Sequence, residues 1–138
     1  VCCRADAEAG HGAEVNAVAM RGSLLLSGAA DGAIVVWRVQ ERAIFKLRTL
    51  RDFGSSYSEG DDVMCVAMPP SWSAAEGLDC PWAAGGAQNG ALTVWATANG
   101  RKAQTLRCSH WVMAASVIVA APPGASHKQT LLLSGSFD

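Results

Sequence analysis

The sequence lacks long hydrophobic runs and is poor in charge. Half of its 138 residues are apolar and 17% are charged, against about 25% charged in an average soluble domain. No uninterrupted apolar run approaches the roughly 20 residues that cross a bilayer as a helix, so we expect no membrane span. The net charge of −1 provides no broad basic surface, which argues against nucleic acid as a partner.

Paired cysteines are also missing. An odd number of unevenly spaced cysteines is typical of reduced, intracellular thiols rather than of a disulfide framework. The sequence has no C-x-x-C pair, and only Cys2 and Cys3 with His11 form a candidate ligand set, which we weigh against incidental thiols. Cys65 and Cys80 are expected in the core, while Cys108 is incidental. We therefore predict no metal, no cofactor, and a cytoplasmic or nuclear location.

One short segment occurs nearly three times. Residues 27–37 (SGAADGAIVVW) and 85–95 (GGAQNGALTVW) agree at six of eleven positions, and both end in tryptophan. LLLSGSFD at 131–138 agrees with LLLSGAAD at 24–31 at six of eight positions. Asp-Gly or Asn-Gly between apolar runs favours a hairpin, because glycine accepts the positive φ of a tight turn. The repeat predicts units of four short antiparallel strands.

These elements resemble the WD-repeat family of β-propellers, and the resemblance covers residues 10–138. The first copy has Gly10-His11, Ser27-Gly28, Asp31-Gly32 and Trp37. The second copy has Gly86, Asn89-Gly90 and Trp95, and the third begins with His110, Ser134-Gly135 and Asp138. The resemblance implies an all-β fold, a partial propeller of two complete four-stranded antiparallel blades plus the first two strands of a third. The small residues of 27–33 would let neighbouring blades pack closely.

The spacing of the copies places the units along the chain. We expect a tail or linker over residues 1–10, blade 1 over 11–50, an inter-blade insertion over 51–62, blade 2 over 63–108 and an incomplete blade 3 over 109–138. Further insertions are expected at 69–82 and 120–129, where proline pairs favour loops. Because propellers close into rings of 4–8 blades, we expect the gene to continue past Asp138. The isolated chain should then aggregate or form oligomers.

Members of this family often stabilise a blade with a hydrogen-bonded network of histidine, serine or threonine, aspartate and tryptophan. Carried over, the first copy supplies His11, Asp31 and Trp37, with Ala29 at the hydroxyl position. With Gly32, Asp31 should form the turn between the second and third strands, and its carboxylate should reach backbone donors or His11.

The later copies match this network less well. The second supplies Trp95, with Asn89 and Ala87 at two other places. The third would supply His110, Ser136 and Asp138. These gaps predict blades that are stabilised by packing more than by the network.

Candidate catalytic groups all have a simpler structural interpretation. The segment GGAQNG at 85–90 has the glycines of a phosphate loop, but no Gly-Lys-Ser/Thr follows it. Cys108-Ser109-His110 places three reactive groups side by side, but adjacency in sequence is not triad geometry. Three carboxylates (Glu59, Asp61 and Asp62) are interpreted as a solvated loop rather than an acid–base or cation site. We predict no catalytic residue and no enzyme.

Candidate binding residues lie in the loops. The polar insertion 51–62 supplies Arg51 and Tyr57, and Trp111 is either an exposed contact residue or a ring buried between blades. A basic run either protects an outer strand edge or forms a docking stripe; its residues are Arg38, Arg42, Lys46, Arg48 and Arg51. The leading hypothesis is a non-enzymatic scaffold for proteins or peptides. The alternatives are a nucleic-acid-binding propeller, or the propeller part of an enzyme whose catalytic domain lies elsewhere.

Overall fold

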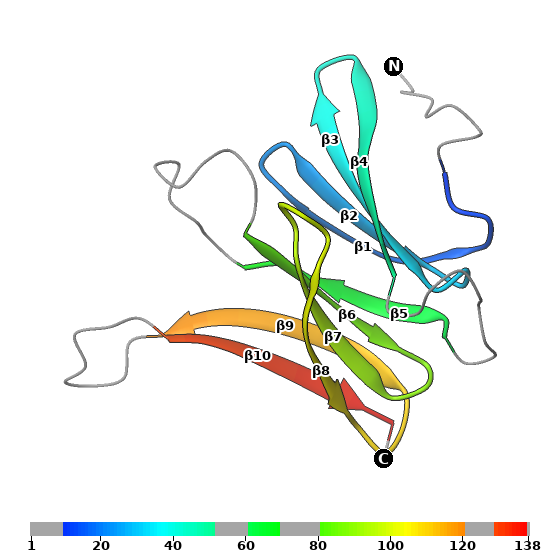
Figure 1. The fold of residues 1–138 in the computed structure, drawn as a ribbon, viewed down its shortest axis with the longest axis vertical. Helices are drawn as coiled ribbons and strands as arrows, with labels where there is room; N and C mark the ends of the chain where they lie inside the picture. Colours follow the sequence, from blue (N-terminus) through cyan, green and yellow to red (C-terminus); the bar gives the residue numbers. More distant parts are fainter. Residues whose placement is uncertain (1–9, 52–60, 70–80, 121–128, 138) are drawn as a thin grey trace.

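Ten β-strands in three antiparallel sheets make up the fold in a computed structural model, which describes residues 10–51, 61–69, 81–120 and 129–137 (Figure 1). The sheets have four, four and two strands and follow the order of the chain. We call them blade 1, blade 2 and blade 3. This confirms the predicted all-β class and the predicted number of strands in each unit.

Each blade is a meander, in which every strand pairs with the next. Blade 1 contains β1 (Val15–Arg21), β2 (Leu24–Ala29), β3 (Ala33–Gln40) and β4 (Ala43–Arg51). Blade 2 contains β5 (Val63–Ala67), β6 (Trp82–Ala87), β7 (Ala91–Ala96) and β8 (Lys102–Arg107). Blade 3 contains β9 (Val112–Ala120) and β10 (Gln129–Ser136). The strand register therefore allows positions in blades 1 and 2 to be compared one by one.

The two repeated tryptophans occupy equivalent positions. Trp37 in β3 pairs with Leu25 in β2, and Trp95 in β7 pairs with Ala83 in β6. Both are buried, with 6% and 4% of their surface exposed. The prediction of equivalent, buried tryptophans is confirmed.

Small residues on the second strand of each blade allow close packing against the next blade. A Cβ atom on Gly28 would lie 2.5 Å from Val63 Cγ1 and 2.8 Å from Val66 Cγ1 of blade 2. A Cβ atom on Gly86 would lie 2.6 Å from Cys65 Sγ and 2.8 Å from Val112 Cβ, the latter in blade 3. Neither glycine could carry a side chain without moving a neighbouring strand.

The core lies between the blades. Leu26, Ile34 and Leu50 of blade 1 are almost fully buried and pack with Val63 and Trp95 of blade 2. A smaller cluster joins blade 2 to blade 3 and contains Cys65, Leu92 and Val112. Cys65 is thus a core residue, as the sequence predicted.

The turns define two opposite ends of the sheets. We call the end that carries residues 10–14, 30–32, 61–62, 88–90 and 108–111 the connecting face; it lies to the right in Figure 1. On this face the β2–β3 and β6–β7 hairpins have the same turn. The opposite face carries the β1–β2, β3–β4 and β7–β8 turns.

Glycine is required in both connecting-face hairpins. Gly32 and Gly90 have φ values of 72° and 82°, and each donates its N–H to the carbonyl three residues earlier at 3.1 Å. This is a tight turn followed by a glycine in the left-handed region. The hairpins at Asp31-Gly32 and Asn89-Gly90 form where the sequence predicts them.

Several predictions fall on parts of the chain outside the described residues. These parts include most of the tail 1–10 and of the insertions at 51–62, 69–82 and 120–129, so the unit boundaries stay predictions. Within the described residues, no helix has the length and hydrophobicity to cross a membrane.

Candidate partner-binding face

A continuous chain of hydrogen bonds joins four residues of blade 1. Trp37 Nε1 donates to Ser27 Oγ at 2.7 Å, and Ser27 Oγ lies 2.7 Å from His11 Nε2. His11 Nδ1 lies 3.2 Å from Asp31 Oδ1. With the proton on Nδ1, the indole donates to serine, serine to histidine, and histidine to aspartate. In this assignment the indole N–H, the serine O–H and the histidine N–H each donate one hydrogen bond within the network, as expected for buried polar groups.

The hydroxyl of this network comes from Ser27, so the prediction that Ala29 occupies the hydroxyl position is wrong. Ser27 and Ala29 point to the same side of β2, because side chains alternate along a strand. Leu25 is on that side too and pairs directly with Trp37. Of the three positions that share the tryptophan's side, only Ser27 carries a hydroxyl. Strand alternation was the signal that could have identified it.

Asp31 connects the β2–β3 turn to the loop that precedes β1 by hydrogen bonds. Its carboxylate accepts the backbone N–H groups of Gly12 at 2.9 Å and Ala33 at 3.0 Å, besides the bond with His11. Burial by itself raises the pKa of Asp31, but these hydrogen bonds outweigh that effect and hold the pKa below its ordinary value. Asp31 therefore stays ionised and stabilises the turn as a carboxylate.

Blade 2 has no such chain around its tryptophan. The position equivalent to Ser27 is Gly85, and a Cβ atom there would overlap Ile34 Cδ1 from blade 1. Trp95 Nε1 is buried and has no hydrogen-bond partner within the described residues. An apolar side chain of the neighbouring blade thus fills the space where blade 1 holds its serine.

The turn of blade 2 is nevertheless fastened by polar contacts. Asn89 Oδ1 accepts the N–H of Ala91 at 2.8 Å, as Asp31 does from Ala33, and Asn89 Nδ2 donates to Asp61 Oδ1 at 2.8 Å. Asp61 is only 6% exposed. Its interpretation as part of a solvated loop is therefore wrong, because its carboxylate is buried and accepts a hydrogen bond from Asn89. Glu59 lies outside the described residues.

The third copy of the network stays a prediction. His110 is exposed, and its proposed partner Asp138 lies outside the described residues. Ser136 Oγ is buried and has no partner within the described part of the chain. By alignment with blade 1, Ser134 rather than Ser136 corresponds to Ser27.

Two of the three predicted contact residues lie on the connecting face, and the third, Tyr57, lies outside the described residues. Arg51 is exposed at the end of β4, and its Nη1 lies 3.4 Å from the carbonyl oxygen of Asp31. Trp111 is 45% exposed, so its ring is an exposed group rather than a buried inter-blade one. Its neighbour Phe137, which no sequence pattern indicated, is 74% exposed, and the two ring centroids lie 6.4 Å apart.

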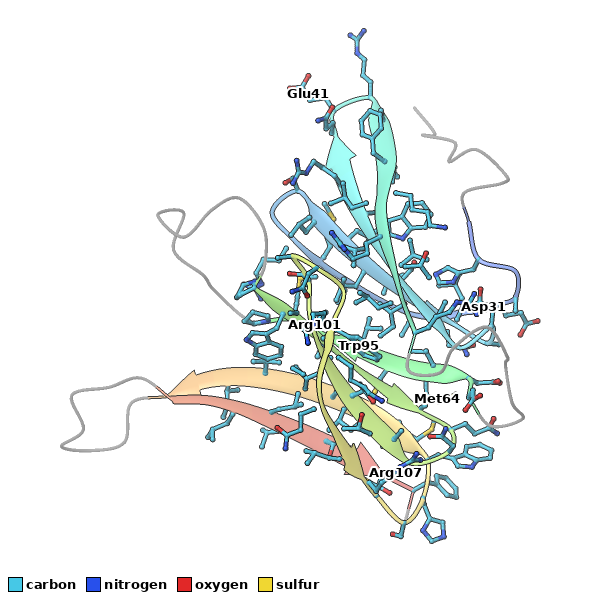
Figure 2. All side chains as sticks on the ribbon, in the orientation of Figure 1. Asp31, Glu41, Met64, Trp95, Arg101 and Arg107 are labelled. Carbon is cyan, nitrogen blue, oxygen red and sulfur yellow. The ribbon has the colours of Figure 1, made fainter. Side chains whose placement is uncertain are left out.

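Figure 2 shows this arrangement: Asp31 and Arg107 both lie at the connecting end of the sheets, while Arg101 lies toward the opposite end. The turns and loops at the connecting end are tied to one another by main-chain hydrogen bonds. Ala30 N–H donates to Glu14 O at 2.8 Å, and Gln88 N–H donates to Asp62 O at 2.9 Å. The connecting face is therefore a fixed surface that presents an aromatic pair and a cation.

Metal-ligating groups do not gather in the described residues, which contain no cluster of three histidine, cysteine or acidic side chains. Cys2 and Cys3, the candidate partners of His11, lie outside them. His11 itself is committed to Ser27 and Asp31. Burial raises the pKa of the Cys65 thiol, partly offset by a hydrogen bond with Gly86, and this keeps the thiol protonated in the core.

Comparison with solved structures supports the propeller fold. The chain is similar to "Structure of U3-55K", a WD40 propeller protein, with a TM-score of 0.60 and 19% sequence identity over 78% of this chain. The match spans 31% of that protein's chain, about a third of its length. No protein-family model and no curated protein matches the sequence. At this level of identity the likeness shows the fold alone.

Proposed function

We propose that the chain is a non-enzymatic scaffold that binds a protein or peptide on its connecting face. The observation that carries this proposal is the exposed aromatic pair of Trp111 and Phe137 on that face. Large exposed aromatic side chains are costly to leave in water and are enriched at the centres of protein interfaces. The intracellular location expected from the cysteines is part of the proposal.

The network of blade 1 supports binding on this face by making it rigid. Ser27, His11 and Asp31 fix the turn at residues 30–32, and Asn89 with Asp61 fixes the turn at 88–90. A partner that docks on fixed turns loses less conformational entropy on binding than one that must order them. Arg51 adds a cation whose side chain is already directed to the turn of Asp31.

The proposal can be tested with a photo-crosslinking amino acid placed at single positions of the intact protein in cells. We expect Trp111 and Arg51 to cross-link one specific protein, which mass spectrometry would identify. Phe45 is the matched control, because it is 50% exposed but belongs to β4. Cross-linking of the same protein from Phe45 with equal yield would contradict a site on the connecting face.

A second test addresses the insertion. Replacement of residues 54–61 by a short Gly-Ser turn should weaken capture of the cross-linked partner while a cooperative thermal transition is preserved. Because Asp61 contacts Asn89, a second variant that replaces only 54–60 separates loss of the loop from loss of that contact. Unchanged capture by both variants would remove the insertion and Tyr57 from the site.

A further inference from the structure

A cavity of about 270 Å³ lies where blade 1 meets the β7–β8 turn of blade 2, on the opposite face from the network. Its apolar lining comes from the first residue of β2 and from the middle of β3 and β4. Two arginines complete it beside the turn of blade 2. The lining residues are Leu24, Val36, Arg38, Leu47, Arg48, Thr97 and Ala98.

Arg48 is held in place at this cavity. Its Nη2 donates to the carbonyl oxygen of Ala98 at 2.7 Å, which joins β4 of blade 1 to the turn of blade 2. Gly100 allows this approach, because a Cβ atom there would lie 3.0 Å from Arg48 Cδ. Part of the ordering cost of this long side chain is therefore met before any ligand arrives.

The guanidinium of Arg48 has unused donors. An arginine has five N–H donors, and within the described residues Arg48 makes this single hydrogen bond and no ion pair. Among the described residues that line the cavity none is acidic, and the second arginine, Arg38, adds positive charge. A half-buried cation beside an apolar surface, with no carboxylate of its own, favours an anionic ligand.

The equivalent place between blades 2 and 3 shows that the fold does not require this charge. Val36 pairs with Arg48 in blade 1, and the equivalent pair in blade 2 is Val94 with Gln104. In the same way, the equivalent of Arg38 is Ala96. A cavity of about 380 Å³ lies here too, and its described lining residues, which include Val94, Ala96 and Gln104, carry no charge. The same position in two blades is thus basic in one and neutral in the other.

We propose that the cavity at Arg48 binds an acidic side chain of a peptide segment from a partner protein. The carboxylate would pair with the guanidinium of Arg48, and the aliphatic part of the segment would lie on Leu24, Val36 and Leu47. The apolar lining and the absence of an aromatic group among the described lining residues favour a peptide over nucleic acid, whose bases bind by stacking on aromatic side chains. The inference rests on the proposed function only in that the ligand is a segment of a protein. The cavity at Arg48 and the connecting face are separate surfaces.

The experiment is a selection of randomised dodecapeptides displayed on phage against the intact protein, with counter-selection against the Arg48→Gln variant. Glutamine already stands at the equivalent position of blade 2, so this variant is expected to fold; circular dichroism would check it. We expect the recovered peptides to share a Glu or Asp flanked by aliphatic residues. A synthetic peptide of that sequence should bind the Arg48→Gln and Arg38→Ala variants at least about ten-fold more weakly than the unchanged protein. A peptide in which Gln replaces the shared Glu should bind the unchanged protein more weakly by the same factor.

Controls separate a specific site from general attraction. Arg42→Gln removes the same charge from the β3–β4 turn outside the cavity, and it should change the affinity less than about two-fold. If Arg48→Gln does not fold, Arg48→Lys keeps the charge but loses the planar donor pair, and the same weakening is expected.

Recovered peptides without an acidic residue, or equal binding by Arg48→Gln, would overturn the proposal. So would an oligouridylate that binds in an Arg48-dependent way when no peptide does. Cross-linking at Trp111 does not depend on any of these outcomes, so each proposal can fail alone.

Discussion

Trp37 and Trp95 occupy the same position in blades 1 and 2, yet their surroundings differ. Trp37 donates to Ser27, and through Ser27 and His11 it is connected to Asp31. Trp95 Nε1 has no hydrogen-bond partner among the residues that the structure describes, and Ile34 fills the space beside it. The same fold thus stabilises one tryptophan by hydrogen bonds and the other by packing.

The difference shows that the members of the network depend on one another. Ser27 is the central member, because it accepts from Trp37 and contacts His11. Blade 2 has glycine at this position, and the loss of the hydroxyl makes room for an isoleucine from blade 1. The unpaired indole is offset by the apolar surface that Ile34 removes from water.

The largest effect should come from removing the central hydroxyl. Ser27→Ala leaves both Trp37 Nε1 and His11 Nε2 without their partner, and each unsatisfied buried group costs about 1–3 kcal/mol. We expect the free energy of unfolding to fall by about 2–4 kcal/mol, measured by urea denaturation of the intact protein. Ser134→Ala removes the exposed hydroxyl of the third copy and should change it by less than about 0.5 kcal/mol. Equal losses in both variants would contradict the role of Ser27.

Removing the carboxylate at Asp31 should cost somewhat less. Asp31→Ala removes the acceptor of the Gly12 and Ala33 N–H groups, but water can partly replace it. We therefore expect the free energy of unfolding to fall by about 1–3 kcal/mol. The same variant at Asn89 should cost less, because Asn89 accepts only one backbone N–H in the described structure. Equal losses at the two turns would contradict the difference between the blades.

The charge of Asp31 also predicts a pH dependence. Its pKa is lower in the folded protein than its ordinary value of 3.8. As the pH falls, the carboxylate is therefore protonated in the unfolded state before it is protonated in the folded state. The stability from this group is present above pH 3.8 and is lost as pH falls through the folded pKa. Asp31→Asn should abolish this part of the acid sensitivity. Urea denaturation at pH 6 and pH 3 measures it, and an unchanged pH slope in Asp31→Asn would exclude Asp31 as its source.

A smaller difference should separate the two tryptophans. Trp→Phe removes the indole N–H and some volume at either position. At Trp37 it also leaves Ser27 without its donor, whereas at Trp95 it removes a donor that has no partner in the described part of the chain. Trp37→Phe should therefore destabilise the protein by about 1 kcal/mol more than Trp95→Phe. A larger loss at Trp95 would mean that its Nε1 makes a stabilising contact.

Much of the fold was predictable from the repeat alone. Asp-Gly and Asn-Gly fixed the two hairpins, and the spacing from each turn to its tryptophan fixed the register of β2 with β3 and of β6 with β7. These features are local, because each turn and its two strands lie within 17 consecutive residues or fewer, 24–40 in blade 1 and 82–96 in blade 2. Asp31 and Trp37 were identified for the same reason.

Contacts between residues far apart in the sequence were harder to predict. Matching the family motif by position selects Ala29, which lies on the same side of β2 as Ser27, but only Ser27 has the hydroxyl that Trp37 and His11 contact. The burial of Asp61 depends on Asn89 in another hairpin, and the bond from Arg48 to Ala98 crosses between blades. No periodicity in one strand reports on these contacts, since they arise only when the sheets are packed together.

The most direct test of the difference between the blades is a double-mutant cycle at Gly85 and Ile34. Gly85→Ser alone should destabilise the protein by about 1–3 kcal/mol, because the new side chain overlaps Ile34 Cδ1. Ile34→Val removes only that methyl group and should cost about 0.5–1.5 kcal/mol. Together they make room for a hydroxyl beside Trp95 Nε1, so the double variant should lose about 1 kcal/mol less than the sum of the single losses. Additive losses, within about 0.5 kcal/mol, would contradict the claim that Ile34 of blade 1 fills, beside Trp95, the space that corresponds to Ser27 beside Trp37.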